Sequence, residues 1–214
     1  MTLQATIQKA IYNGYQQAAN VLGAPFDLFR PSGADTPIQQ ANRVGTFNAS
    51  FDYSVYTFGK PGLYGKPVAY ALIDGAQLEV GDYLQGDSGT FFVATLQPLL
   101  PIAVVCCNAT LNVLRPYSAP GVGALPYGGD IRSEEVPVMT AFPGSVLTKS
   151  RGEKGEVNLP GDVKVAWFEV LLPYIGAEIK FADVIDMDNG MRLKVGTVER
   201  TDLGFRLLAQ YAGT

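Results

Sequence analysis

Two short stretches of this 214-residue sequence contain closely spaced carboxylates that could support chemistry. Paired carboxylates can act as a general acid and base, and closely spaced ones can bind a calcium ion. The first stretch contains Asp82 and Asp87, and the second contains Asp183, Asp186 and Asp188.

Turn chemistry explains these carboxylates more simply than a metal does. The run Asp186–Gly190 resembles the start of a calcium loop, but its twelfth position, where such a loop needs a bidentate Glu, is Thr197. Asp side chains at turns bond nearby backbone, and Gly supplies a positive φ. We therefore predict structural turns at both sites and no metal; the turn residues are Asp87, Gly89, Asp188 and Gly190.

Other catalytic chemistries lack their residues. The chain contains no histidine, which removes Ser-His-Asp and Cys-His catalysis and most catalytic zinc sites. Neither a P-loop nor a Gly-x-Gly-x-x-Gly motif is present. Cys106 and Cys107 are adjacent in an apparent strand, so their side chains point to opposite faces and we predict free thiols. The sequence predicts no enzyme, no catalytic residue and no cofactor.

The composition favours neither nucleic-acid binding nor insertion into a membrane. The net charge is −4 and the pI about 4.8, without a global basic footprint. No signal peptide and no bilayer-length apolar run are recognisable. Only 17% of residues are charged, as expected where subunits cover one another, although a turn-rich β monomer would explain the same value.

One stretch occurs twice. Residues 76–89 and 177–190 align without gaps and share Ala, Asp, Asp and Gly at four positions. Both lead into β-rich runs, as expected for one supersecondary unit used twice. The identical pairs are Ala76 and Ala177, Asp82 and Asp183, Asp87 and Asp188, and Gly89 and Gly190.

The elements around the repeat predict a mainly β fold. Apolar residues at spacings of three and four predict a helix over residues 3–22, capped by Thr2 and ended by Gly23. We expect two related small β-barrel or sandwich modules and long irregular loops. The predicted domains are an N-terminal helix (1–24), a first β module (25–115), a linker or loop region with a possible strand (116–165) and a second β module (166–214), which can pack as one domain with the first.

The loops suggest contact with other molecules. Residues 31–45 are polar with few charges, and long loops of this kind are often functional. Residues 151–156 form a charged, exposed loop, in which Glu153 and Lys154 are candidates for a channel-lining or interface position.

The pattern Gly81-Asp-Tyr-Leu-x-x-Asp-x-Gly-x-Phe-x-Val93 resembles the small β-barrel neck proteins of tailed bacteriophages, which lie between portal and tail. The second copy, from Asp183 to Val195, is similar but has Ala182 in place of the glycine. This resemblance implies a virion protein, assembled in the host cytoplasm, that forms a homo-oligomeric ring with portal, neck or tail proteins. Double-stranded DNA would pass through the ring without sequence-specific contact.

Two alternatives stay open. A baseplate or tail-tube-initiating protein would use similar barrels. A ligand- or carbohydrate-binding β domain would use exposed tyrosines, for which the candidates are Tyr53, Tyr56, Tyr64 and Tyr127.

Overall fold

The computed structural model describes residues 2–53, 66–116, 135–149 and 166–212. Glu153 and Lys154 lie outside these residues, as do Tyr56, Tyr64 and Tyr127. The described chain is mainly β with one N-terminal helix, which confirms the predicted fold class.

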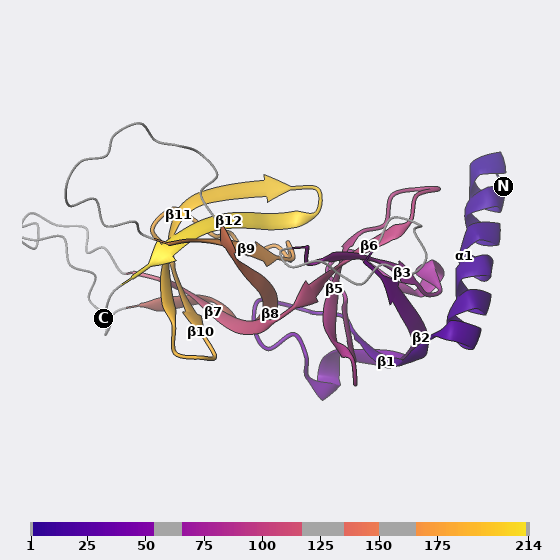
Figure 1. Cartoon of the computed structure of the whole chain (residues 1–214), viewed down its shortest axis with the longest axis horizontal. Coiled ribbons are helices and arrows are strands. Elements are labelled where there is room, and N and C mark those ends of the chain that lie inside the picture. Colours follow the sequence, from indigo (N-terminus) through magenta and orange to yellow (C-terminus); the bar gives the residue numbers. More distant parts are fainter. Residues whose placement is uncertain (1, 54–65, 117–134, 150–165, 213–214) are drawn as a thin grey trace, which may run out of the picture.

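The strands close into two six-stranded barrels (Figure 1). Barrel 1 contains β1 (Ala24–Phe29), β2 (Arg43–Asp52), β3 (Val68–Leu72), β4 (Tyr83–Gly86), β5 (Gly89–Thr95) and β6 (Ile102–Cys107), with the short 3-10 helices η1 (Gln40–Asn42) and η2 (Gly75–Gln77). Barrel 2 contains β7 (Ala109–Arg115), β8 (Val136–Lys149), β9 (Trp167–Leu172), β10 (Val184–Met187), β11 (Arg192–Thr201) and β12 (Gly204–Tyr211).

The two barrels have the same topology. Barrel 1 runs β1-β2-β3-β6-β5-β4 and closes between β4 and β1, whereas barrel 2 runs β7-β8-β9-β12-β11-β10 and closes between β10 and β7. Each strand of barrel 1 therefore has its counterpart six strands later. The repeated sequence stretch is one part of a whole repeated barrel, and closure leaves neither sheet with a free edge.

The boundary between the modules differs from the predicted one. β7 and β8, which fall in the predicted first module and linker, pair with each other and close barrel 2 through β10. The prediction followed proximity along the chain, whereas barrel closure joins strands far apart in sequence. A signal was present: Leu111–Pro116 repeats the alternation of Phe26–Pro31, and both end in Arg-Pro.

The barrels share a packed interface. The interior of barrel 1 is one apolar cluster, in which Phe51 stacks on Phe91 with ring centroids 3.9 Å apart. A second cluster fills barrel 2 and continues into side chains of barrel 1 that point out of it, namely Phe29, Tyr83, Phe92 and Val105. The two modules therefore pack as one body rather than as tethered domains.

The helix α1 (Leu3–Leu22) begins and ends where the sequence predicts. The Thr2 hydroxyl accepts the Ala5 amide at 3.3 Å, as an N-cap does. Gly23 is needed for close approach and not for a positive φ, because its φ is −90° and a Cβ there would lie 2.7 Å from the Ala49 carbonyl oxygen.

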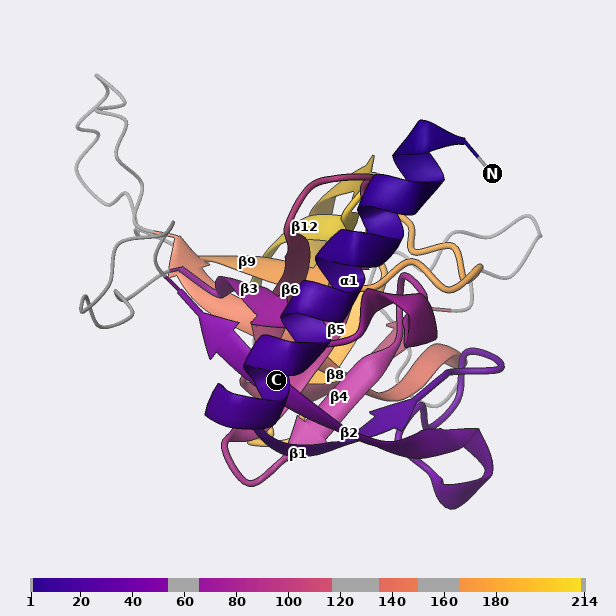
Figure 2. The same cartoon turned by 90° about the vertical axis from the view of Figure 1, so that its right-hand side faces the viewer.

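The helix covers the end of barrel 1 that faces away from barrel 2 (Figures 1 and 2). It packs along β2, where the side-chain Nδ2 of Asn48 donates to Asn20 Oδ1 at 3.2 Å. Tyr12 lies over Gly75, where any Cβ would approach its ring to 2.4 Å. The order along the molecule is thus α1, barrel 1, barrel 2.

The predicted loop at residues 31–45 is short and contacts barrel 2 of the same chain. The Thr36 amide donates to the Thr140 carbonyl and the Thr140 amide to the Ala34 carbonyl, both at 2.9 Å. This bridge to β8 adds to the interface between the barrels.

Candidate functional site: a repeated arginine–aspartate clamp

The predicted turn residues of the first copy lie in the β4–β5 hairpin. Gly86 and Gly89 are partners, so Asp87 and Ser88 form a two-residue loop. Gly89 has a φ of +131°, which only glycine adopts readily.

The second hairpin, between β10 and β11, is one residue longer. The Met187 amide donates to the Met191 carbonyl at 2.9 Å, and Gly190 within this loop has a φ of +80°. Asp188 does more than form the turn, because its Oδ2 accepts the Thr110 amide of β7 at 3.0 Å.

A calcium ion is not needed to explain the second acidic stretch. Asp186 Oδ1 pairs with Arg192 at 2.9 Å, and Asp188 is bonded to backbone. Among the residues that the structure describes, no three metal-ligating side chains are grouped.

Asp82 and Asp183, predicted only as turn residues, are nearly fully buried and each binds an arginine. Arg30 donates from Nε to Asp82 Oδ1 at 2.9 Å and from Nη2 to Oδ2 at 2.8 Å. Arg115 binds Asp183 through the same atoms, both at 2.9 Å. We call each arginine–aspartate pair, with the turn it holds, a clamp.

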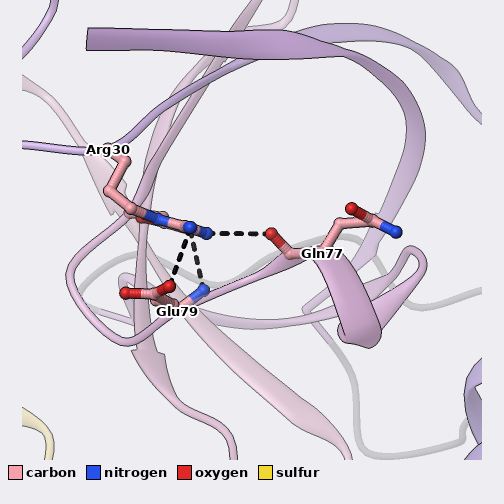
Figure 3. Close-up of polar contacts among 4 residues, drawn as sticks. Arg30, Gln77 and Glu79 are labelled. Carbon is pink, nitrogen blue, oxygen red and sulfur yellow. Dashed lines mark hydrogen bonds and ion pairs between the residues drawn. The ribbon is translucent and has the colours of Figure 1, made fainter.

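Each clamp fixes the turn before β4 or β10. In barrel 1, Asp82 Oδ2 also accepts the Glu79 amide at 2.7 Å, and the Asp82 amide donates to the Glu79 carbonyl. Arg30 Nη2 reaches the Gln77 carbonyl at 2.9 Å, so the guanidinium lies between Gln77 and Glu79 (Figure 3).

Barrel 2 repeats these bonds residue for residue. Asp183 Oδ2 accepts the Lys180 amide at 2.7 Å, and Arg115 Nη2 donates to the Glu178 carbonyl at 2.7 Å. Both buried carboxylates therefore have several hydrogen-bond donors, which a buried charge requires.

Each turn presents an apolar side chain to solvent. Val80 is 50% exposed and Phe181, its counterpart, is 74% exposed. The next residue has a positive φ in both turns, +94° at Gly81 and +68° at Ala182. An alanine in this region is strained, so the clamp of barrel 2 holds a less favourable backbone than that of barrel 1.

The electrostatics of the clamp indicate a fixed ion pair. Hydrogen bonding to Asp82 raises the pKa of Arg30, and hydrogen bonding to Asp183 raises the pKa of Arg115. A guanidinium that stays charged cannot act as a general base at ordinary pH. Each clamp thus joins the end of one strand to the start of another across the barrel closure.

The cysteines are free, as predicted. Cys106 packs against the barrel 1 cluster and Cys107 against the cluster shared with barrel 2, so they point to opposite faces. Burial raises the pKa of the Cys107 thiol, which keeps it protonated and unreactive.

Sequence reasoning missed the two arginines. Arg30 and Arg115 are 52 and 68 positions from their aspartates. The signal that could have found them is the shared Arg-Pro ending of the two counterpart strands.

Comparison with known proteins finds no matching family model, no matching curated protein and no matching solved structure. No helix among the described residues is long and apolar enough to cross a membrane.

Proposed function

We propose that this chain is a structural subunit that works by assembling with other subunits, as the oligomeric ring of a tailed-phage neck. In this role the ring joins the capsid portal to the tail and surrounds the DNA channel. The placement in a phage neck rests on the sequence resemblance around Gly81–Val93, and the assembly rests on the surface of α1.

The exposed apolar surface of α1 carries the proposal. The exposed fractions are 77% for Leu3, 42% for Ile7 and 82% for Val21. These residues recur at heptad-like positions, and the positions of the same pattern between them are Ala10, Gly14 and Gln17. Lys9 is the only charged residue of the helix. Several exposed apolar side chains on one almost uncharged element are typical of an interaction site.

The free end of barrel 2 is less suited to this role. Phe92 and Val105 are opposite each other on β5 and β6 and pack toward barrel 2. Their counterparts on β11 and β12 are Lys194 and Gln210. Two of the apolar side chains that hold barrel 2 on barrel 1 are thus replaced by polar ones, so the helix end is the better candidate for a subunit contact.

The proposal is tested by measuring the mass of the purified protein in solution and imaging it by negative stain. A ring with a central hole supports it, and a monomer at all concentrations contradicts it. The runner-up, a baseplate or tail-tube-initiating protein, predicts rings as well. Binding to a purified portal or to a purified tail hub distinguishes the two.

A ligand- or carbohydrate-binding domain is the alternative from another class. Of the four tyrosines that are candidates for this binding site, only Tyr53 lies among the described residues, and its side chain is half-buried. Burial and a hydrogen bond with Cys106 raise its pKa to about 12. Saturable binding of an oligosaccharide that Tyr53→Ala abolishes would favour this alternative.

A further inference from the structure

The two clamps differ in one charged contact. In barrel 1 the Arg30 guanidinium binds two carboxylates, Asp82 through Nε and Nη2 and Glu79 through Nη1 at 2.7 Å. The Glu79 side chain is 65% exposed, so this second carboxylate approaches from the solvent side.

In barrel 2 the position of Glu79 is occupied by Lys180. Arg115 keeps its bonds to Asp183, but among the described residues no other carboxylate lies within ion-pair distance of it. Lys180 Nζ instead lies 3.9 Å from Glu178 Oε2, and both side chains are mostly exposed. The guanidinium edge that holds Glu79 in barrel 1 therefore lacks its carboxylate in barrel 2.

Arg115 also borders a cavity of about 780 Å³ that is widely open to solvent. Glu178 lies on the same rim, and the remaining lining is almost entirely apolar. It includes Ala34, Val136, Pro137, Val138, Ile175 and Ala177. A cationic group at the rim of an apolar cavity is the arrangement that holds a ligand with a charged head and an apolar body.

We propose that this cavity binds an aliphatic carboxylate. The carboxylate group of the ligand pairs with Arg115 in the way that the Glu79 carboxylate pairs with Arg30. The apolar chain of the ligand packs against Val136, Val138 and Ile175. The site is separate from α1 and does not depend on the assembly proposed above.

A carboxylate fits better than a phosphate. The geometry of barrel 1 shows a carboxylate, not a larger dianion, on this guanidinium edge. Glu178 on the rim adds a negative charge that disfavours a second charge on the ligand.

The carboxylate that binds Arg115 can belong to a free aliphatic acid or to a glutamate side chain of a protein. Hexanoate serves as the probe for the first. A capped peptide with the sequence of residues 77–81, which contains the Glu79 side chain, serves as the probe for the second. Both are titrated into the full chain at constant ionic strength, and the arginine Nε–H resonances are followed by NMR.

Lys180→Glu is the decisive variant, because it gives barrel 2 the same glutamate that barrel 1 has at position 79. That glutamate should pair with Arg115 and compete with the ligand. Lys180 is 60% exposed, so neither this variant nor its matched control, Lys180→Gln, disturbs the core. We expect Lys180→Glu to weaken binding at least ten-fold and Lys180→Gln to change it less than three-fold. Hexanamide, which lacks the charge, should bind at least ten-fold more weakly than hexanoate.

Binding of either probe with these variant effects supports the proposal, and the probe that binds more tightly identifies the source. Any of these results would overturn it: no binding of either probe, equal binding of hexanamide and hexanoate, or full binding to Lys180→Glu. Tighter binding of inorganic phosphate than of hexanoate would also overturn it.

Discussion

Tyr83 of barrel 1 donates a hydrogen bond of 2.8 Å from its Oη to the backbone carbonyl of Pro143 in barrel 2. Tyr83 is fully buried, and its ring also contacts Phe142 edge-on. The bond therefore lies inside the interface at which the two copies of one barrel pack together.

Removing this hydroxyl should loosen the interface. Tyr83→Phe leaves the Pro143 carbonyl without its donor in a dry environment, which costs about 1–3 kcal/mol of unfolding free energy. Urea denaturation measures this loss. Tyr211→Phe, at a residue that is 53% exposed, is the matched control and should change stability by less than about 0.5 kcal/mol. Equal effects of the two variants would show that the Tyr83 bond contributes nothing.

The clamps should be the most sensitive polar sites of the barrels. Asp82→Asn and Asp183→Asn each leave an arginine without its buried counter-charge, and we expect a loss of about 3 kcal/mol in each case. The control is Glu79→Gln, which removes the exposed ion pair to Arg30 and should cost less than about 1 kcal/mol. If the two aspartate variants unfold at the same denaturant concentration as Glu79→Gln, the clamps have no structural role.

The two turns make an internal comparison of backbone strain. Ala182→Gly relieves the positive φ of +68° and should stabilise the protein by about 0.5 kcal/mol, after the entropy that glycine adds to the unfolded state. Gly81→Ala imposes the same strain at φ +94° and should destabilise it by about 1 kcal/mol. Thermal unfolding of both variants measures the two effects, which must have opposite signs.

Stability should decline on the alkaline side. Burial raises the pKa of both the Cys107 thiol and the Tyr83 hydroxyl in the folded state. Their stabilising effect is complete below the unfolded values of about 8.5 and 10 and is lost as the pH rises above these. The expected slope is about 1.4 kcal/mol per pH unit for each group. Cys107→Ala should flatten the decline that begins near pH 8.5 and leave the decline above pH 10.

The local elements could be predicted because they depend on local patterns. The helix at residues 3–22 follows from its apolar spacing and its Thr2 cap, and the hairpins follow from their Asp-x-Gly loops. The repeat was visible where identities persist, in the stretches that begin at Ala76 and Ala177.

The topology could not be predicted in this way. β1 and β7 are counterparts, yet Phe26 aligns with Leu111 and Leu28 aligns with Val113. At these positions the residues differ, and only their apolar character is kept. Barrel closure decides which strand belongs to which module, and it joins residues far apart in the chain. For the same reason the Arg30–Asp82 and Arg115–Asp183 pairs could not be predicted from either stretch alone, and only the Arg-Pro ending shared by the two strands pointed to the arginines.

The proposed assembly through α1 is tested most directly by light scattering on the purified chain over a range of concentrations. Val21→Asp places a charge on the exposed apolar surface of the helix, and Gln16→Asp places the same charge on its polar surface. The account predicts an oligomer for the unmodified chain and for Gln16→Asp, and a monomer for Val21→Asp. A monomer in all three cases, or an oligomer that Val21→Asp leaves intact, would contradict it.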